Sequence, residues 1–160
     1  AYQGIKDSGN LTSFEHLVIA DGQKNSTLAD SFELVLKSFL VSKGIENPKF
    51  LRMRLGLIPC RERKQKHEPH VDYPVPHYTG LLYFNKNDAN TTLYQSKYEP
   101  SSNKTIKEYL TEDLHNDLII SSEIEPTENK IVIFNGLHYH CSSVPTTNDR
   151  IVMTFNYVSG

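Results

Sequence analysis

The chain has 160 residues, a formal net charge of −2 at neutral pH and a hydrophobic content of 38%. This length suits one domain with a buried core, and the charged fraction of 22% is typical of a folded rather than a disordered chain. The slightly acidic balance argues against a strongly basic nucleic-acid binder, and no apolar run approaches the roughly 18 residues of a membrane span.

The N-terminal stretch and the cysteines bear on the compartment. The stretch AYQGIKDSGN has neither the basic nor the apolar region of a signal peptide. Cys60 and Cys141 are the only cysteines, too few for a disulfide framework, and both are expected to be reduced. These observations predict a cytoplasmic protein, in the host cell if the gene is carried by a phage.

The first 48 residues are predicted to be mainly helical support. Residues 14–20 form a candidate strand before a turn at Asp21-Gly22, and a helix is expected from about residue 28 to residue 43. Thr27 is the expected N-cap and Gly44 the expected stop. The apolar positions recur at helical spacing and form one stripe for packing against a sheet: Leu28, Phe32, Val35, Leu36, Phe39 and Leu40.

From Lys49 onward the hydrophobic period changes to two. Leu51, Met53, Leu55 and Leu57 alternate with Phe50, Arg52, Arg54 and Gly56, which predicts a half-buried strand. For the two arginines a site-lining role and a solvated strand face both stay open, and the solvated face is the commoner case. Pro59 ends this strand, and a polar, basic loop leads to His70.

Short strands then follow at 79–85, 91–95, 118–125, 130–135 and 150–158. A short helix is expected within 96–116, with Ile106, Tyr109 and Leu110 directed inward, and a loop is expected over 136–149. Many short strands separated by turns favour a mainly β fold, a double-stranded β-helix or jelly roll with a flanking N-terminal helix. We predict a single domain over residues 1–160, with the jelly-roll core at 49–158.

The stretch His70-Val71-Asp72 is the strongest candidate for chemistry. In an extended chain the side chains of residues i and i+2 share a face, roughly 6–7 Å apart along the strand, so one metal ion can bridge them. A third ligand is available downstream from His138 or His140. Two histidines and one carboxylate that leave coordination positions open are the ligand set of non-haem Fe(II) oxygenases. His16, His67, His77 and His115 have no comparable context and are predicted to lie on the surface.

Arg150 begins the last strand, on the face that also carries Val152, Thr154 and Asn156. An arginine at the inner end of such a strand needs an anionic partner, because an unpaired buried charge is very costly. A dicarboxylate that binds the metal with its other end would supply that partner through two parallel hydrogen bonds. A surface pair with Asp149 or Glu128 is the alternative.

Over residues 50–158 the chain resembles the 2-oxoglutarate/Fe(II)-dependent dioxygenases, most closely their prolyl-hydroxylase-like group. The resemblance rests on the HVD stretch at 70–72, on the strand that ends YFN at 83–85, and on a histidine ten residues before Arg150. The C-terminal half also resembles small oxygenases of marine phages. Two features depart from the family: Ala89-Asn90-Thr91-Thr92 stands where many members have Gly-Gly-Thr, and Arg150-Ile151-Val152 where many have Arg-x-Ser.

The resemblance implies a set of roles. His70, Asp72 and His140 would bind Fe(II), and the family's spacing to the basic residue favours His140 over His138. Arg150 would bind the C5 carboxylate of 2-oxoglutarate, with Tyr83 and Thr79 beside it. No catalytic residue beyond the metal ligands is then required. With O₂, and with ascorbate as an optional reductant, such an enzyme hydroxylates a C–H bond and releases succinate and CO₂.

The substrate class stays open between a peptidyl residue, with proline as one candidate, and a small molecule. A non-catalytic metal-binding β-sandwich, such as a virion-associated binding module, is the alternative, but it needs neither Arg150 nor Tyr83. Cupin enzymes use more histidines in a different order. Nucleic-acid demethylases of the AlkB type carry a second arginine where this chain has Asn156, so a nucleic-acid partner is disfavoured.

Overall fold

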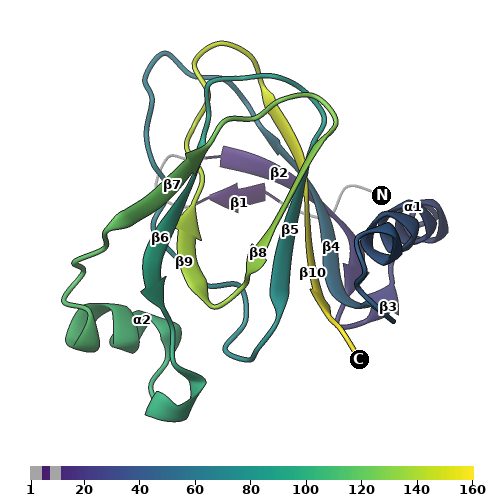
Figure 1. Ribbon diagram of the computed structural model, residues 1–160. Helices are drawn as coiled ribbons and strands as arrows, with labels where there is room; N and C mark the ends of the chain where they lie inside the picture. The colour runs from purple at the N-terminus through teal and green to yellow at the C-terminus, as the bar shows by residue number, and fades with distance from the viewer. Residues whose placement is uncertain (1–4, 8–11) are drawn as a thin grey trace.

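The computed structural model describes residues 5–7 and 12–160, and it folds as two antiparallel β-sheets with short helices packed beside them (Figure 1). The large sheet has the strand order β1-β2-β4-β10-β5-β8, with β3 paired to β2, and the small sheet has the order β7-β6-β9. The mainly β, jelly-roll class predicted from the strand pattern is confirmed.

The bounds of the strands follow the alternating segments closely. The large sheet contains β1 (Ile5–Asp7), β2 (Thr12–Ala20), β3 (Gln23–Lys24), β4 (Lys49–Ile58), β5 (Tyr78–Tyr83), β8 (Lys130–Asn135) and β10 (Arg150–Val158). The small sheet contains β6 (Thr91–Lys97), β7 (Ile120–Ile124) and β9 (His138–Cys141). Strands β1 to β3 come from the region expected to be helical support, so that region also contributes to the large sheet.

Helix α1 (Ala29–Ser42) covers part of the large sheet, as Figure 1 shows beside β4 and β10. Its buried residues Leu36 and Leu40 pack in one cluster with Met53 of β4 and Phe155 of β10. Burying an aliphatic side chain of this size contributes about 1.5–3 kcal/mol. The stripe is narrower than predicted, because Leu28 and Val35 remain 43% and 58% exposed.

A second cluster of apolar side chains joins the small sheet to the segment after β6. That segment holds the short helices η1 (Pro100–Ser102), α2 (Ile106–Glu108) and the π-helical turn η2 (Tyr109–Asp113). The side chain of Thr105 accepts from the Glu108 N–H and the Glu108 side chain accepts from the Thr105 N–H, a reciprocal cap that starts α2. Ile106, Tyr109 and Leu110 pack inward, as predicted.

A third cluster of apolar side chains lies between the two sheets. Leu81 and Val152 of the large sheet pack with Leu93 of β6 and Ile124 of β7. Strand β10 therefore buries both faces: Met153, Phe155 and Tyr157 join the cluster under α1, while Val152 faces the small sheet. This is the division of faces that the alternation in 150–158 predicts.

Three local expectations are wrong. The pairing of β10 with β4 shifts between Asn156 and Tyr157, so the alternation in β4 breaks and Phe50 is buried in the same cluster as Met53. The expected loop 136–149 contains strand β9, which is only four residues long and follows a turn. The N-cap of α1 is Leu28 rather than Thr27, and it has no side-chain cap.

Over residues 5–7 and 12–160, the helices are too short or too polar to cross a lipid bilayer. Cys60 is exposed and Cys141 buried, and the two form no disulfide.

Candidate metal centre and its cavity

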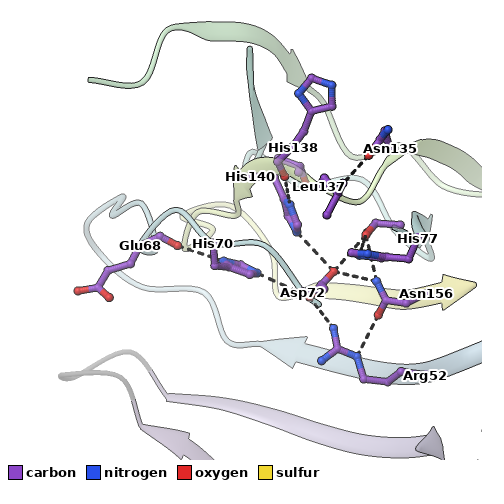
Figure 2. Close-up of polar contacts among 12 residues, drawn as sticks. Arg52, Glu68, His70, Asp72, His77, Asn135, Leu137, His138, His140 and Asn156 are labelled. Carbon is purple, nitrogen blue, oxygen red and sulfur yellow. Dashed lines mark hydrogen bonds and ion pairs between the residues drawn. The ribbon is translucent and has the colours of Figure 1, made fainter. Parts of the chain in front are cut away.

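His70, Asp72 and His140 converge in the structure. His70 and His140 face each other as an antiparallel bridge, with both N–H···O=C bonds between them at 3.0 Å. Asp72 lies two residues further along the same segment, so that one potential ligand atom from each residue lies within 4.8 Å of the others. Figure 2 shows both imidazole rings directed toward the Asp72 carboxylate. Strand β9 and the segment before β5 therefore bring the three side chains together.

The two histidine rings are held so that one nitrogen of each is free for a metal. His70 Nδ1 lies 3.1 Å from the Glu68 carbonyl oxygen, and His140 Nδ1 lies 3.0 Å from the His138 carbonyl oxygen. A carbonyl oxygen can only accept, so each Nδ1 carries the proton and each Nε2 keeps its lone pair. The two Nε2 atoms lie 3.9 and 3.6 Å from the Asp72 carboxylate oxygens. This donor set fits a divalent transition metal bound by two imidazoles and one carboxylate.

His138, the other candidate for the third ligand, is directed elsewhere. Its Nδ1 lies 2.9 Å from the Tyr94 carbonyl oxygen of β6. Figure 2 shows the ring of His138 turned away from Asp72. His140 is the histidine that the structure brings to the trio.

The Asp72 carboxylate is fixed by three neighbours that the strands of the large sheet supply. Arg52 of β4 donates to Oδ1 at 2.5 Å. Asn156 of β10 and Thr79 of β5 donate to Oδ2 at 2.9 and 3.2 Å. Arg52 also donates to the Asn156 side-chain oxygen at 3.0 Å, which closes the network drawn in Figure 2. Outer contacts of this kind orient a metal ligand and tune its affinity.

The electrostatics favour the protonation states that a metal requires. Burial would raise the pKa of the Asp72 carboxyl, but contact with His140 and the charge of Arg52 together hold it well below its usual value. Burial lowers the pKa of His70. The His70 side chain is still 48% exposed, so water weakens the effect of burial. Asp72 is then ionised and His70 neutral at neutral pH, as metal binding needs.

Replacing Arg52 by leucine is expected to lower the affinity for a divalent metal by about 10–100-fold, because Asp72 loses its ion pair and its orientation. Arg54→Leu is the matched control, since Arg54 pairs with Glu15 at 2.8 Å instead of with Asp72. Titration calorimetry with Co(II), which takes the same nitrogen and oxygen ligands, measures both variants. Equal affinities for Arg52→Leu and Arg54→Leu would remove this role from Arg52.

The three residues line one wall of a cavity of about 1150 Å³. The cavity reaches from the trio to Arg150, Val152 and Thr154 of β10, and to Ile106 and Leu110 beside the small sheet. Leu81 and Val152 give the inner part an apolar wall. The metal candidates and the basic residue before the last strand therefore share one compartment.

Arg150 is 2% exposed and has no carboxylate partner among the residues that the structure describes. Its guanidinium donates to the Ala89 carbonyl and, at 2.9 Å, to the Thr91 hydroxyl, and it lies 5.3 Å from the centre of the Tyr83 ring. Its Nε is buried and has no hydrogen-bond partner there. Burial lowers the pKa of Arg150 below its usual value. A buried cation of this kind is costly unless an anion joins it.

The remaining predicted site residues, Thr79 and Tyr83, occupy two different places. Tyr83 is fully buried, and its hydroxyl lies 2.8 Å from the Thr91 hydroxyl, beside Arg150. Thr79 contacts Asp72 at the metal end of the cavity. Thr91 lines the cavity itself, and no local sequence pattern marks it as a site residue. Arg52 and Asn156 also belong to the site, but their contact with Asp72 depends on the order of the strands, which local sequence patterns do not give.

Of the four histidines expected on the surface, His115 is exposed, His16 and His67 are partly buried, and His77 is buried. His77 is 4% exposed, with Nδ1 2.7 Å from the Val75 carbonyl oxygen and Nε2 3.4 Å from Thr79. His67 lines the cavity, and its Nε2 is buried. Neither residue has a local sequence pattern that marks it, since both lie in irregular segments that other parts of the chain cover.

Comparison with solved structures gives close likenesses in fold. A 2OG-Fe(II) oxygenase family protein from Burkholderia pseudomallei matches with a TM-score of 0.65 and 10% identity, over 98% of this chain and 73% of that one. The epimerase SnoN in complex with Fe³⁺, alpha ketoglutarate and nogalamycin RO matches with a TM-score of 0.66 and 11% identity, over 99% and 67% of the two chains.

A prolyl hydroxylase from Trichoplax adhaerens, in complex with a hypoxia inducible factor peptide fragment, matches with a TM-score of 0.54 and 15% identity. That match covers 92% of this chain, which spans 63% of the longer hydroxylase. No protein-family model and no curated protein sequence matches the chain. At these identities the likeness concerns the architecture, and the chain has the fold of the 2OG-Fe(II) oxygenases.

Proposed function

We propose that the protein is an Fe(II)- and 2-oxoglutarate-dependent oxygenase that hydroxylates a C–H bond. The observation that carries the proposal is one cavity with two complementary ends. At one end two imidazoles and a carboxylate converge, and at the other the guanidinium of Arg150 is buried without an anion among the described residues. A dicarboxylate whose other end chelates the metal would satisfy both ends.

In this proposal the chain's own residues mainly bind and orient. His70, Asp72 and His140 hold Fe(II), while Arg52, Asn156 and Thr79 keep the Asp72 carboxylate in place. Arg150 and Thr91 hold the distal carboxylate, and a hydrogen bond between the Tyr83 and Thr91 hydroxyls orients Thr91. Bound Fe(II) with 2-oxoglutarate supplies the O₂-dependent oxidation that yields succinate and CO₂.

The substrate is proposed to be a peptidyl residue, with proline as one candidate, or a small molecule. The cavity lining combines apolar Ile106 and Leu110 with Lys107, and the large sheet adds the half-buried ion pair of Arg54 with Glu15. Such a mixed wall can bury an apolar C–H group while it binds a polar neighbour. Both substrate kinds have parallels in the structural neighbours, of which one holds a peptide fragment and another nogalamycin RO.

Turnover without a known substrate tests the proposal. An enzyme of this chemistry is expected to convert 2-oxoglutarate slowly even when its substrate is absent. Purified protein with Fe(II), O₂ and 2-oxoglutarate is therefore expected to release succinate. Asp72→Ala is expected to release none above the protein-free background. Succinate release that is the same for the wild type and Asp72→Ala would contradict the proposal. Added proline-containing peptides that raise the rate would favour the peptidyl substrate.

A further inference from the structure

His67 is the second buried polar group in the cavity that lacks a partner. Its Nε2 is enclosed and makes no hydrogen bond within the described part of the chain, and the same holds for Nε of Arg150. Both residues line the cavity that contains the metal candidates. A buried polar group without a partner costs about 1–3 kcal/mol. Two such groups on the wall of one cavity indicate a ligand that would satisfy both.

The His67 ring and the Arg150 guanidinium interact electrostatically. Burial is the main cause that lowers the pKa of the His67 ring, and the charge of Arg150 is the second. The imidazole is therefore neutral at neutral pH and carries one N–H. With that proton on Nε2 the ring is a donor, as is the guanidinium Nε–H of Arg150. Two donors cannot satisfy each other, whereas an anion accepts from both.

The backbone holds His67 firmly at this position. Its N–H donates to the Ser142 carbonyl at 2.8 Å, and the Val144 N–H donates to the Gln65 carbonyl at 2.7 Å. Lys66 and Ser143 form an antiparallel bridge between these bonds. The segment before His70 therefore runs beside the end of β9 and the residues after it, and the register shifts by one residue between the Lys66–Ser143 bridge and the His70–His140 bridge. The same two segments therefore bring the metal ligands together and hold the backbone of His67.

We propose that His67 is a positioning residue for the cosubstrate, and that its Nε2–H donates to the distal carboxylate held by Arg150 and Thr91. This inference rests on the proposed function, because it takes 2-oxoglutarate as the dicarboxylate. It assigns the loop 61–69 a role in cosubstrate binding. This chain has Val152 where the family's Arg-x-Ser serine would stand, so His67 would supply a polar contact that the valine does not.

The test compares two keto acids on three proteins. 2-Oxoglutarate and pyruvate share the 2-keto acid end that chelates a metal, but pyruvate has no distal carboxylate. Fe(II)-loaded wild type, His67→Leu and His67→Gln are titrated with each compound without O₂, and the visible charge-transfer band of the chelate gives the dissociation constants. Glutamine is the conservative variant, because its amide nitrogen lies as many bonds from Cα as Nε2 of histidine.

For 2-oxoglutarate, His67→Leu is expected to raise the dissociation constant about tenfold, the effect of losing one hydrogen bond to a charged group. For pyruvate it is expected to change nothing, and His67→Gln is expected to restore most of the 2-oxoglutarate affinity. An unchanged constant for His67→Leu, or an equal loss for both keto acids, would overturn the role of His67 while the oxygenase proposal stands. A wild type that binds pyruvate and 2-oxoglutarate equally, or neither, would overturn both.

Discussion

The His140→Ala variant is expected to lose Fe(II) binding, whereas His138→Ala is expected to keep it. His140 directs Nε2 toward Asp72 at 3.6 Å, and its Nδ1 is occupied by the His138 carbonyl. The ring of His138 contacts the Tyr94 carbonyl instead. Since the loss of even an outer partner costs about 10–100-fold in metal affinity, the loss of a direct ligand is expected to exceed about a hundredfold. Anaerobic Fe(II) titration measures both variants.

The two variants are well matched, because both histidines lie on β9 and each substitution removes one side-chain hydrogen bond to a backbone carbonyl. The carbonyl that His140 contacts belongs to the backbone of residue 138, so His138→Ala leaves that bond in place. Equal melting temperatures establish that both variants fold. Iron binding that survives in His140→Ala and disappears in His138→Ala would show that the metal centre has been assigned to the wrong histidine.

Replacing Arg150 by leucine is expected to weaken 2-oxoglutarate binding by about a hundredfold or more. Removing one partner of a buried charge pair costs about 2–5 kcal/mol, and about 1.4 kcal/mol corresponds to tenfold in affinity. Arg150 is 2% exposed, so bulk solvent compensates little for the loss of its contact with a carboxylate. Fe(II) binding is expected to stay unchanged, because Arg150 contacts Ala89, Thr91 and Tyr83 and none of the metal candidates.

Thermal unfolding provides a second readout for this variant. Wild-type protein with 2-oxoglutarate at a hundred times its dissociation constant is expected to gain about 2.7 kcal/mol in the free energy of unfolding. Arg150→Leu is expected to gain almost none at the same concentration. Arg150→Lys keeps the charge without the planar fork and is expected to fall between them. A full 2-oxoglutarate stabilisation of Arg150→Leu would show that the dicarboxylate binds elsewhere.

Sequence patterns predicted the parts of the site that depend on local spacing. The two-residue step from His70 to Asp72 places both side chains on one face wherever the chain is extended. The alternation in β10 correctly separates the cavity face of Arg150 from the face under α1. The strands β5, β8 and β10 were also predictable, because each is a continuous apolar or alternating run between turn residues.

The supporting residues were not predictable, because they meet only through pairings between distant segments. Arg52 reaches Asp72 since β4 lies beside β10, and nothing in the alternation of β4 distinguishes that from a solvated arginine. Thr91 comes to Arg150 from the other sheet. His67 lies in a polar loop that the sequence marks as solvated, and its burial results from pairing with 142–144. The break in alternation at Phe50 results from a register shift against β10.

The measurement that tests the central claim most directly is the anaerobic titration of the Fe(II)-loaded protein with 2-oxoglutarate, followed by the visible charge-transfer band of the chelate. The account predicts a band that saturates in the wild type and is absent in Asp72→Ala. Bound iron without any band would contradict the oxygenase proposal, and it would favour a metal-binding β-sandwich in which the cavity between the trio and Arg150 holds some other anion.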